Sequence, residues 1–252
     1  MSSSEKFIIG HRIVQLNSVD STNNYAATLF KQGKLSHGSV ILADEQYSGR
    51  GQRGAKWESN PGLNALLTVV LEPANLSVSS QFLLTKVVSL SVSGALNRLG
   101  IAAHIKWPND IYCNDKKIAG ILIENTSSSG LIRNSCVGIG INVNQTQFDV
   151  PYATSVKGET GQFHKVMDLL FVLISELNFW YDKLLENDLK TLDEEYLNRL
   201  YKFNEKGTFE DVNGIFEGVI AGVEVSGKLL IERDGFLKHY DLKEISFVRN
   251  SL

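Results

Sequence analysis

Residues 49–54, with the sequence Gly-Arg-Gly-Gln-Arg-Gly, constrain this chain more than any other segment. They come shortly after a strand-like run at residues 40–46. Glycine lets a backbone approach a ligand closely, and arginine carries a fixed charge and a fork of donors that suit carboxylate or phosphate. The segment therefore predicts a loop that closes over a small anion. The alternative from these residues alone is a solvated turn with two surface arginines.

Composition limits the class of protein. The chain has 252 residues, 43% of them hydrophobic, which is enough for a full-size core and a small appended domain. A net charge of -3 argues against binding nucleic acid through bulk positive charge. Cys113 and Cys136 form neither a metal-binding spacing nor a disulfide framework, which predicts reduced thiols. Because residues 1–10 do not resemble a signal peptide and no run approaches ~18 apolar residues, we expect a soluble cytoplasmic protein without a membrane partner.

Helices are predicted where apolar residues recur with helical periodicity. The expected helices span residues 20–33, 79–99, 166–185 and 192–201. The side chain of Ser21 or Asp20 is expected to cap the first helix, which Gly33 can end. Gly100 is expected to end the second helix in the same way.

Strands are predicted between these helices and again after them. The expected strands include residues 40–43, 63–71, 104–107 and 131–143, with a hairpin formed by residues 111–112 and 118–124. Pro108 breaks the third of these strands because it cannot donate to a ladder. After residue 207 the pattern changes to short strands and turns, which predicts a small barrel of about five strands. We therefore expect two domains, residues 1–204 and 205–252.

Ser21, Thr22 and Asn23 stand at the expected start of the first helix. These residue types commonly cap helices, and capping is their structural interpretation. Their functional interpretation is a polar pocket in which hydroxyls and an amide recognise a neutral polar head group.

Two further segments place charges at strand ends. Residues 106–110, Lys-Trp-Pro-Asn-Asp, combine turn-forming residues with a lysine and a carboxylate. Asp110 could hold Mg²⁺ or orient an incoming amine. Lys117 heads an apolar strand and is either a solvated end residue or a positive charge at the mouth of an apolar pocket. Gly120 leaves that strand thin enough for a ligand to lie against it.

Gly138 and Gly140 thin another strand, which Asn142 ends with an amide. A bulged core strand is the structural alternative. Taken together, the polar segments imply a site for an apolar small molecule with a polar ring at one end and an acid at the other, and they supply charge to neutralise a phosphate. The sequence contains no Walker-type P-loop, no nucleophile elbow and no metal-type histidine pair.

In this order, the segments resemble the motifs of the biotin–protein ligases, also called biotin–acetyl-CoA-carboxylase ligases. The resemblance covers most of residues 15–165 and rests on Ser21-Thr22-Asn23, Gln46, residues 49–54, Trp57, residues 106–110, 117–120 and 138–142, and the later residues 154–161. It implies an α+β catalytic domain with a mixed β-sheet flanked by helices, like that of class II synthetases. A small SH3-like β-barrel is expected after it.

The resemblance implies an ATP-dependent ligase that acts in two steps. The carboxylate of biotin attacks the α-phosphate of MgATP, giving biotinyl-5′-AMP and pyrophosphate. The ε-amine of a lysine on a biotin carboxyl carrier domain then displaces AMP. ATP, Mg²⁺ and biotin are thus expected as substrates and activator, with no tightly bound prosthetic group.

The resemblance also implies roles for individual residues. The expected catalytic residues are Lys117, Arg50 and Asp110, and Asp110 is also the expected Mg²⁺ ligand. The expected contacts of biotin are Ser21, Thr22, Asn23, Gln46, Arg50, Gly51, Gln52, Lys117 and Gly120. The expected contacts of ATP or the adenylate are Arg53, Trp57, Lys106, Asn109 and Asn142.

Two departures from the family pattern matter. Gln52 stands where many relatives have arginine, which removes one charge from the loop. Some relatives carry an N-terminal helix-turn-helix domain and act as repressors, but here the motif at Ser21 begins too early for such a domain, so no DNA partner is expected. The alternatives to a biotin ligase are a lipoate or octanoate ligase or transferase, a non-catalytic binding module and a repressor. A monomer and a homodimer both remain open.

Overall fold

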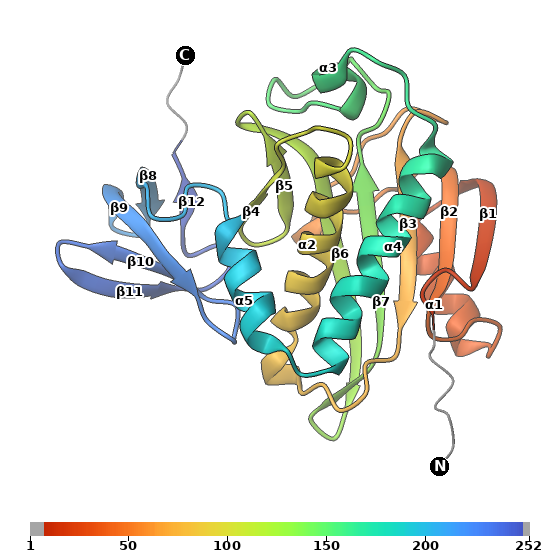
Figure 1. The fold of residues 1–252 in the computed structure, drawn as a ribbon, viewed down its shortest axis with the longest axis horizontal. Helices are drawn as coiled ribbons and strands as arrows, with labels where there is room; N and C mark the ends of the chain where they lie inside the picture. The colour runs from red at the N-terminus through yellow and green to blue at the C-terminus, as the bar shows by residue number, and fades with distance from the viewer. Residues whose placement is uncertain (1–7, 249–252) are drawn as a thin grey trace.

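The computed structural model describes residues 8–248, and a seven-stranded mixed sheet forms its centre (Figure 1). The strands are β1 (Arg12–Val19), β2 (Ser39–Gln46), β3 (Ala65–Leu71), β4 (His104–Lys106), β5 (Asp110–Cys113), β6 (Lys116–Ser128) and β7 (Leu131–Ile141). They lie in the order β1-β2-β3-β7-β6-β5-β4. β1 and β2 are parallel, and every other neighbouring pair in this sheet is antiparallel.

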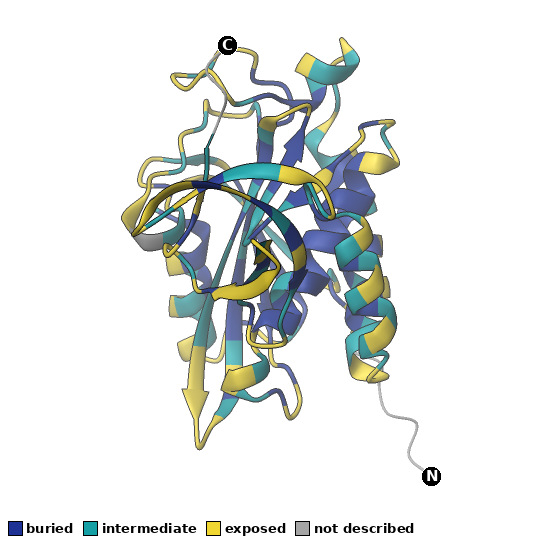
Figure 2. Ribbon diagram, turned by 90° about the vertical axis from the view of Figure 1, so that its left-hand side faces the viewer, coloured by how far each residue is buried: buried dark blue, intermediate teal, exposed yellow. Residues whose placement is uncertain are grey.

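Helices cover both faces of this sheet (Figure 1). They are α1 (Thr22–Lys31), α2 (Phe82–Asn97), α3 (Val156–Thr160), α4 (Val166–Leu185) and α5 (Leu189–Asn198), with short 3₁₀ helices η1 (Gln52–Gly54) and η2 (Val78–Ser80). Side chains of a strand alternate between faces, so Val40 and Leu42 join the core under α2 and α4, while Ile41 packs with α1. Figure 2 shows the buried residues concentrated where helices and strands meet.

The predicted helices and the apolar strands are confirmed, with ends that shift by a few residues. The elements β1, α3, η1 and η2 were not predicted. β1 is an edge strand whose residues are mostly exposed or half-buried, so it carries no apolar run. α3 has only five residues; the Ser155 hydroxyl caps it by accepting from Gly158 N at 3.1 Å, and Gly161 ends it with φ 74°.

The expected capping of α1 by its own residues was wrong. Ser21 occupies the N-cap position, but its side chain makes no capping hydrogen bond. Asp20 instead accepts from Asn24 Nδ2 at 2.6 Å. The Thr22 backbone N–H donates to Gln46 Oε1 at 2.7 Å, so a side chain from the end of β2 satisfies the first turn. Gly33, with φ 67°, follows the end of the helix as expected.

This arrangement predicts that Ser21→Ala changes the free energy of unfolding by less than about 0.5 kcal/mol, although a capping serine usually contributes ~1 kcal/mol. Gln46→Leu should cost about 1–3 kcal/mol, because it leaves the Thr22 N–H without its partner. Urea denaturation of the two variants measures both values. A larger loss for Ser21→Ala than for Gln46→Leu would contradict the assignment.

A second, five-stranded antiparallel sheet follows α5 and lies to the left in Figure 1. Its strands are β8 (Lys206–Asp211), β9 (Gly214–Val223), β10 (Leu229–Arg233), β11 (Phe236–Tyr240) and β12 (Ser246–Phe247). The expectation of five short strands is confirmed. The Trp107 indole N–H donates to Gly227 O at 2.8 Å and ties this sheet to the larger unit. A domain boundary between residues 204 and 205 remains our prediction.

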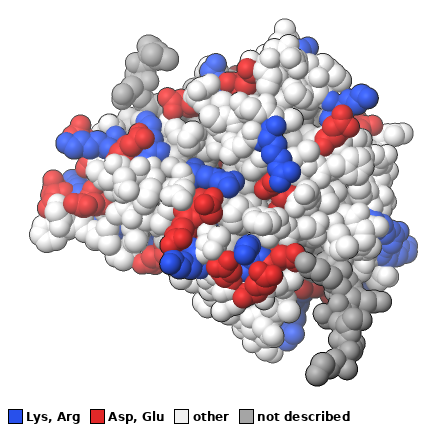
Figure 3. Space-filling view, in the orientation of Figure 1, with Lys and Arg blue, Asp and Glu red and all other residues white. Residues whose placement is uncertain are grey.

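The surface carries charges of both signs. On the face shown in Figure 3, basic and acidic side chains are interspersed and no large patch of one sign forms. Among residues 8–248, no helix combines the length and the apolar character that crossing a membrane requires.

Candidate active site

A cavity of about 250 Å³ lies between the start of α1, the loop after β2 and the strands β6 and β7. Most of the residues that the sequence singled out line it, although they lie in separate segments of the chain. The predicted residues that it brings together are Ser21, Thr22, Asn23, Gln46, Arg50, Gly51, Gln52, Trp57, Asn109, Asp110, Lys117 and Gly120. The sequence-based site is therefore one continuous surface in space.

Three glycines form the floor of this cavity. A Cβ atom on Gly140 would lie 2.5 Å from Trp57 Cε2, and one on Gly120 would lie 2.9 Å from Trp57 Cζ3. A Cβ atom on Gly138 would lie 2.7 Å from Asn23 Oδ1. Contacts below 3 Å exclude a side chain unless its neighbours move. The thin strands thus make room for Trp57 and Asn23, whereas the sequence suggested only that they make room for a ligand.

Lys117 and Asp110 form an ion pair in the cavity, with Lys117 Nζ 2.6 Å from Asp110 Oδ1. The backbone of Lys117 is fixed on both sides, since its N–H donates to Tyr152 O at 2.7 Å and its carbonyl accepts from Thr154 N at 2.9 Å. Its ammonium group lies 5.4 Å from the centre of the Trp57 ring. This places a fixed cation between the indole and a carboxylate, where it can meet an anionic ligand.

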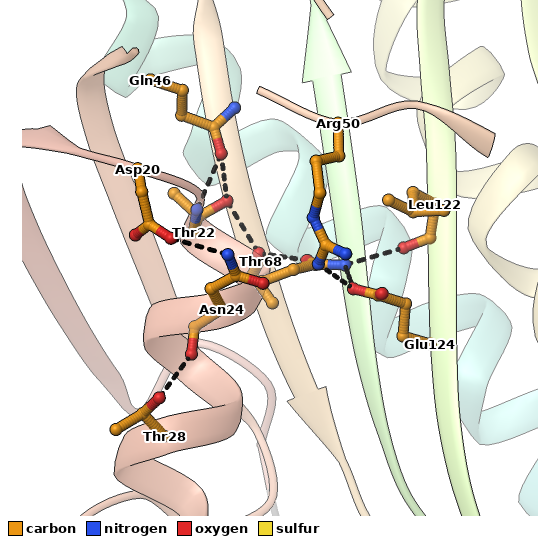
Figure 4. Close-up of polar contacts among 10 residues, drawn as sticks. Asp20, Thr22, Asn24, Thr28, Gln46, Arg50, Thr68, Leu122 and Glu124 are labelled. Carbon is orange, nitrogen blue, oxygen red and sulfur yellow. Dashed lines mark hydrogen bonds and ion pairs between the residues drawn. The ribbon is translucent and has the colours of Figure 1, made fainter. Parts of the chain in front are cut away.

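A chain of hydrogen bonds runs along one end of the cavity (Figure 4). Gln46 Oε1 accepts from Thr22 N, and Thr68 Oγ1 lies 2.8 Å from Thr22 Oγ1 and 2.6 Å from Asn23 Oδ1. Asn23 Nδ2 donates to Glu124 Oε2 at 2.8 Å. This end of the cavity therefore offers both donors and acceptors to a neutral polar group.

The last member of this series of hydrogen bonds is Arg50, whose Nη2 lies 2.7 Å from the same oxygen of Glu124 (Figure 4). Sequence reasoning missed Glu124 and Thr68. The local signal was weak: Thr68 and Glu124 are polar residues that follow apolar residues in their strands. The structure buries Thr68 fully. Such positions identify polar networks only when the strand pairing is known.

Three predicted site residues are not part of this cavity lining. Lys106 Nζ donates to Tyr112 Oη at 3.2 Å and lies 4.9 Å from the centre of the Phe247 ring, next to the C-terminal sheet, and its expected adenylate contact stays a prediction. Asn142 is buried and donates to Thr154 O at 3.0 Å. The side chain of Arg53 lies outside the described part of the structure.

A second cavity of about 650 Å³ adjoins the first, and both are lined by Lys56, Trp57 and Lys117. Asn142 lines this second cavity, together with much of the segment 145–153. Val150 and Tyr152 in that segment are exposed apolar residues. Sequence reasoning missed the segment, although exposed apolar side chains in a loop are a signal for binding. The two cavities can together hold an elongated ligand that passes Lys117.

The comparison with protein families decides the identity of the fold. Residues 16–142 match the model of the "Biotin/lipoate A/B protein ligase family". The chain belongs to this family. The matched region contains every residue that lines the first cavity.

Individual relatives agree with this assignment. The bifunctional ligase/repressor BirA of Escherichia coli is 31% identical to the chain, and the match covers 94% of the chain and 74% of BirA. The biotin–[acetyl-CoA-carboxylase] ligase of Paracoccus denitrificans is 34% identical over 86% of the chain and 92% of that protein. The biotin protein ligase from Aquifex aeolicus, solved in complex with biotin and ATP, is 28% identical with a TM-score of 0.79, covering 95% of this chain and 100% of that one. These matches confirm the predicted α+β fold with its small SH3-like sheet.

Proposed function

We propose that the protein activates biotin with ATP to biotinyl-5′-AMP and transfers biotin to a lysine of a biotin carboxyl carrier domain. The observation that carries this proposal is the meeting of Lys117 and the Arg50 loop in one cavity within the family-matched region. The names of the relatives from Paracoccus and Aquifex support the same substrates.

The first step brings two anions together, the carboxylate of biotin and the α-phosphate of ATP. Their repulsion must be offset by cations held in place before the reaction. Lys117 is the proposed group between them, and the ion pair with Asp110 keeps its Nζ in the cavity. Arg50, with the backbone of Gly51 and Gln52, is proposed to cover the carboxylate end. Lys117 would also stabilise the charge that develops when the acceptor amine displaces AMP.

The polar end of the cavity is the proposed site of the biotin ring. That ring has a carbonyl acceptor and two N–H donors, and the chain of Gln46, Thr22 and Asn23 offers the matching partners. A lipoyl group has no comparable polar ring, so this network favours biotin over lipoate. Polar groups left unpaired disfavour the wrong ligand strongly.

The second cavity is the proposed site of the adenosine. Trp57 stands between the two cavities and presents an aromatic ring, and Asn142 supplies an amide to the second cavity. Asn109 lines the first cavity and is proposed to lie near the phosphates or the incoming lysine. A nucleotide contact of Lys106 remains a prediction from the sequence, although Lys106 lines neither cavity.

Magnesium enters this proposal as part of the MgATP substrate. Residues 8–248 contain no cluster of three or more His, Cys, Asp or Glu side chains that could hold a metal ion. Asp110 is committed to Lys117 at 2.6 Å and offers one carboxylate. Since Mg²⁺ is often held by one or two carboxylates and the substrate phosphates, Asp110 is proposed as one ligand of an ion that arrives with the nucleotide.

The proposed acceptor is the carrier domain of a carboxylase, without DNA as a partner. A cytoplasmic location is also our proposal, supported by the two buried free cysteines, Cys113 and Cys136. Biotin-dependent release of pyrophosphate from MgATP tests the first step. Release that requires lipoate instead of biotin would contradict the substrate assignment.

Gln52 leads to a prediction about the adenylate. Gln52→Arg is expected to slow the release of biotinyl-5′-AMP about 5- to 10-fold, because a charged hydrogen bond to a phosphate is stronger than a neutral one. The release rate is measured on a gel-filtered complex of protein and labelled adenylate. Gln52→Met, which has similar length and no charge, is the matched control. Equal release from wild type and Gln52→Arg would contradict this prediction.

A further inference from the structure

Arg50 is already paired in this structure. Its Nη2 lies 2.7 Å from Glu124 Oε2, and each side chain is 41% exposed. The pair joins the loop after β2 to the middle of β6. A cation that has a carboxylate partner attracts a second anion less strongly than an isolated one. The Arg50 charge is therefore not fully available to a ligand while Glu124 holds it.

Glu124 Oε2 is shared between two parts of the site. Asn23 Nδ2, at the polar end, donates to this oxygen at 2.8 Å, and Asn23 Oδ1 is bound by Thr68 Oγ1 at 2.6 Å. One carboxylate oxygen thus links the head-group contacts to the loop arginine.

The hydroxyl groups of Thr22 and Thr68 each carry one proton, which limits the hydrogen bonds that they can donate. Thr68 has one hydroxyl proton, and it contacts both Thr22 Oγ1 and Asn23 Oδ1. Because the amide oxygen of Asn23 only accepts, that proton goes to Asn23. The Thr22 hydroxyl proton then has two acceptors within reach, Thr68 Oγ1 at 2.8 Å and Gln46 Oε1 at 3.0 Å. Gln46 Oε1 therefore accepts from the Thr22 backbone N–H and competes with Thr68 for the Thr22 hydroxyl proton.

We propose that Glu124 is a positioning residue that competes with the acid group of the ligand for Arg50 and so sets how strongly that acid is bound. This inference rests on the function proposed above, in which Arg50 meets the biotin carboxylate. Glu124 holds Arg50 over the cavity, and a ligand gains Arg50 fully only when it carries an anion. Glu124 thereby lowers the affinity for the acid end and leaves the affinity for the ring unchanged.

The test compares two ligands, biotin and biotin amide, which lacks the anion. Glu124→Gln keeps the shape of the side chain and removes its charge. It is expected to raise the affinity for biotin about 5- to 20-fold, in the usual range of coupling between sites. The affinity of this variant for biotin amide should stay within about 2-fold of the wild-type affinity, because the amide carries no anion for Arg50 to bind. Titration calorimetry of the full chain measures both values.

Two controls test whether the change in biotin affinity comes from Glu124 acting on Arg50 or from the loss of any negative charge. Glu45→Gln removes the same charge from β2, where Glu45 contacts Ser18 at 2.9 Å and does not line the cavity, and it should change neither affinity. In an Arg50→Ala background, Glu124→Gln should no longer increase the affinity for biotin. Equal effects of Glu124→Gln on the two ligands, a loss of biotin affinity, or a gain that persists without Arg50 would overturn the inference. Failure of the wild type to bind either ligand would instead contradict the proposed function.

Discussion

Replacing Lys117 by glutamine is expected to lower kcat/KM for adenylate formation about 10²- to 10³-fold, the usual loss when one preorganised charge-stabilising group is removed. Glutamine keeps a hydrogen-bonding group of similar length but has no charge to offset the repulsion between carboxylate and phosphate. It also leaves Asp110 without its partner at 2.6 Å, which adds negative charge where an anion must enter. Biotin-dependent pyrophosphate release measures the loss.

Lys116→Gln is the matched control for this variant. Lys116 precedes Lys117 on β6 and is exposed, and it does not line the cavity. Its replacement changes the net charge equally and should leave kcat/KM within about 2-fold, because exposed charges are screened by solvent and salt. Unchanged turnover in Lys117→Gln, or an equal loss in Lys116→Gln, would contradict the role of Lys117.

Gly140→Val is expected to weaken biotin binding about 10- to 100-fold, because overpacking a well-packed site costs some 1–3 kcal/mol and each 1.4 kcal/mol is about tenfold in affinity. Its Cβ would lie 2.5 Å from Trp57 Cε2, so the indole must move into the cavity. Valine suits a strand, and the fold is therefore expected to remain. Titration with biotin measures the binding, and thermal unfolding measures the fold.

Ile141→Val is the control for Gly140→Val. Ile141 is the next residue of β7, is fully buried in the core and does not line the cavity. The loss of one methyl group should cost about 0.5–1.5 kcal/mol of stability and leave binding unchanged. Normal binding by a folded Gly140→Val variant would show that the glycine floor is not needed for the ligand.

The sequence was sufficient for most of the fold because the core elements have strong periodic patterns. Leu169, Leu170, Leu173 and Leu177 lie on one face of α4 and are all buried. β1 had no such pattern, since its stability comes from pairing with β2 and not from an apolar run of its own. The cap of α1 could not be predicted from the sequence either, because Gln46 lies 24 residues away from Thr22, whose backbone N–H donates to it.

The site could be predicted where a residue's chemistry is visible in a local motif. Lys117 and Gly51 of the loop were found in this way, and both line the cavity. Lys106 belongs to the same motif as Asp110, but its Nζ lies beside the ring of Phe247 in the C-terminal sheet. Because Phe247 is far away in the sequence, no local pattern indicates that contact. Glu124 became visible only through its bonds to Asn23 and Arg50, which are far away in the sequence.

Mass spectrometry of a carrier domain after incubation with the protein, biotin and MgATP tests the central claim most directly. The account predicts one biotinyl group on a single lysine of the carrier, dependent on both biotin and MgATP, and its loss when Lys117→Gln replaces the wild type. Absence of the biotinyl group from every biotin carboxyl carrier domain tried, with protein that is folded and binds biotin, would contradict it.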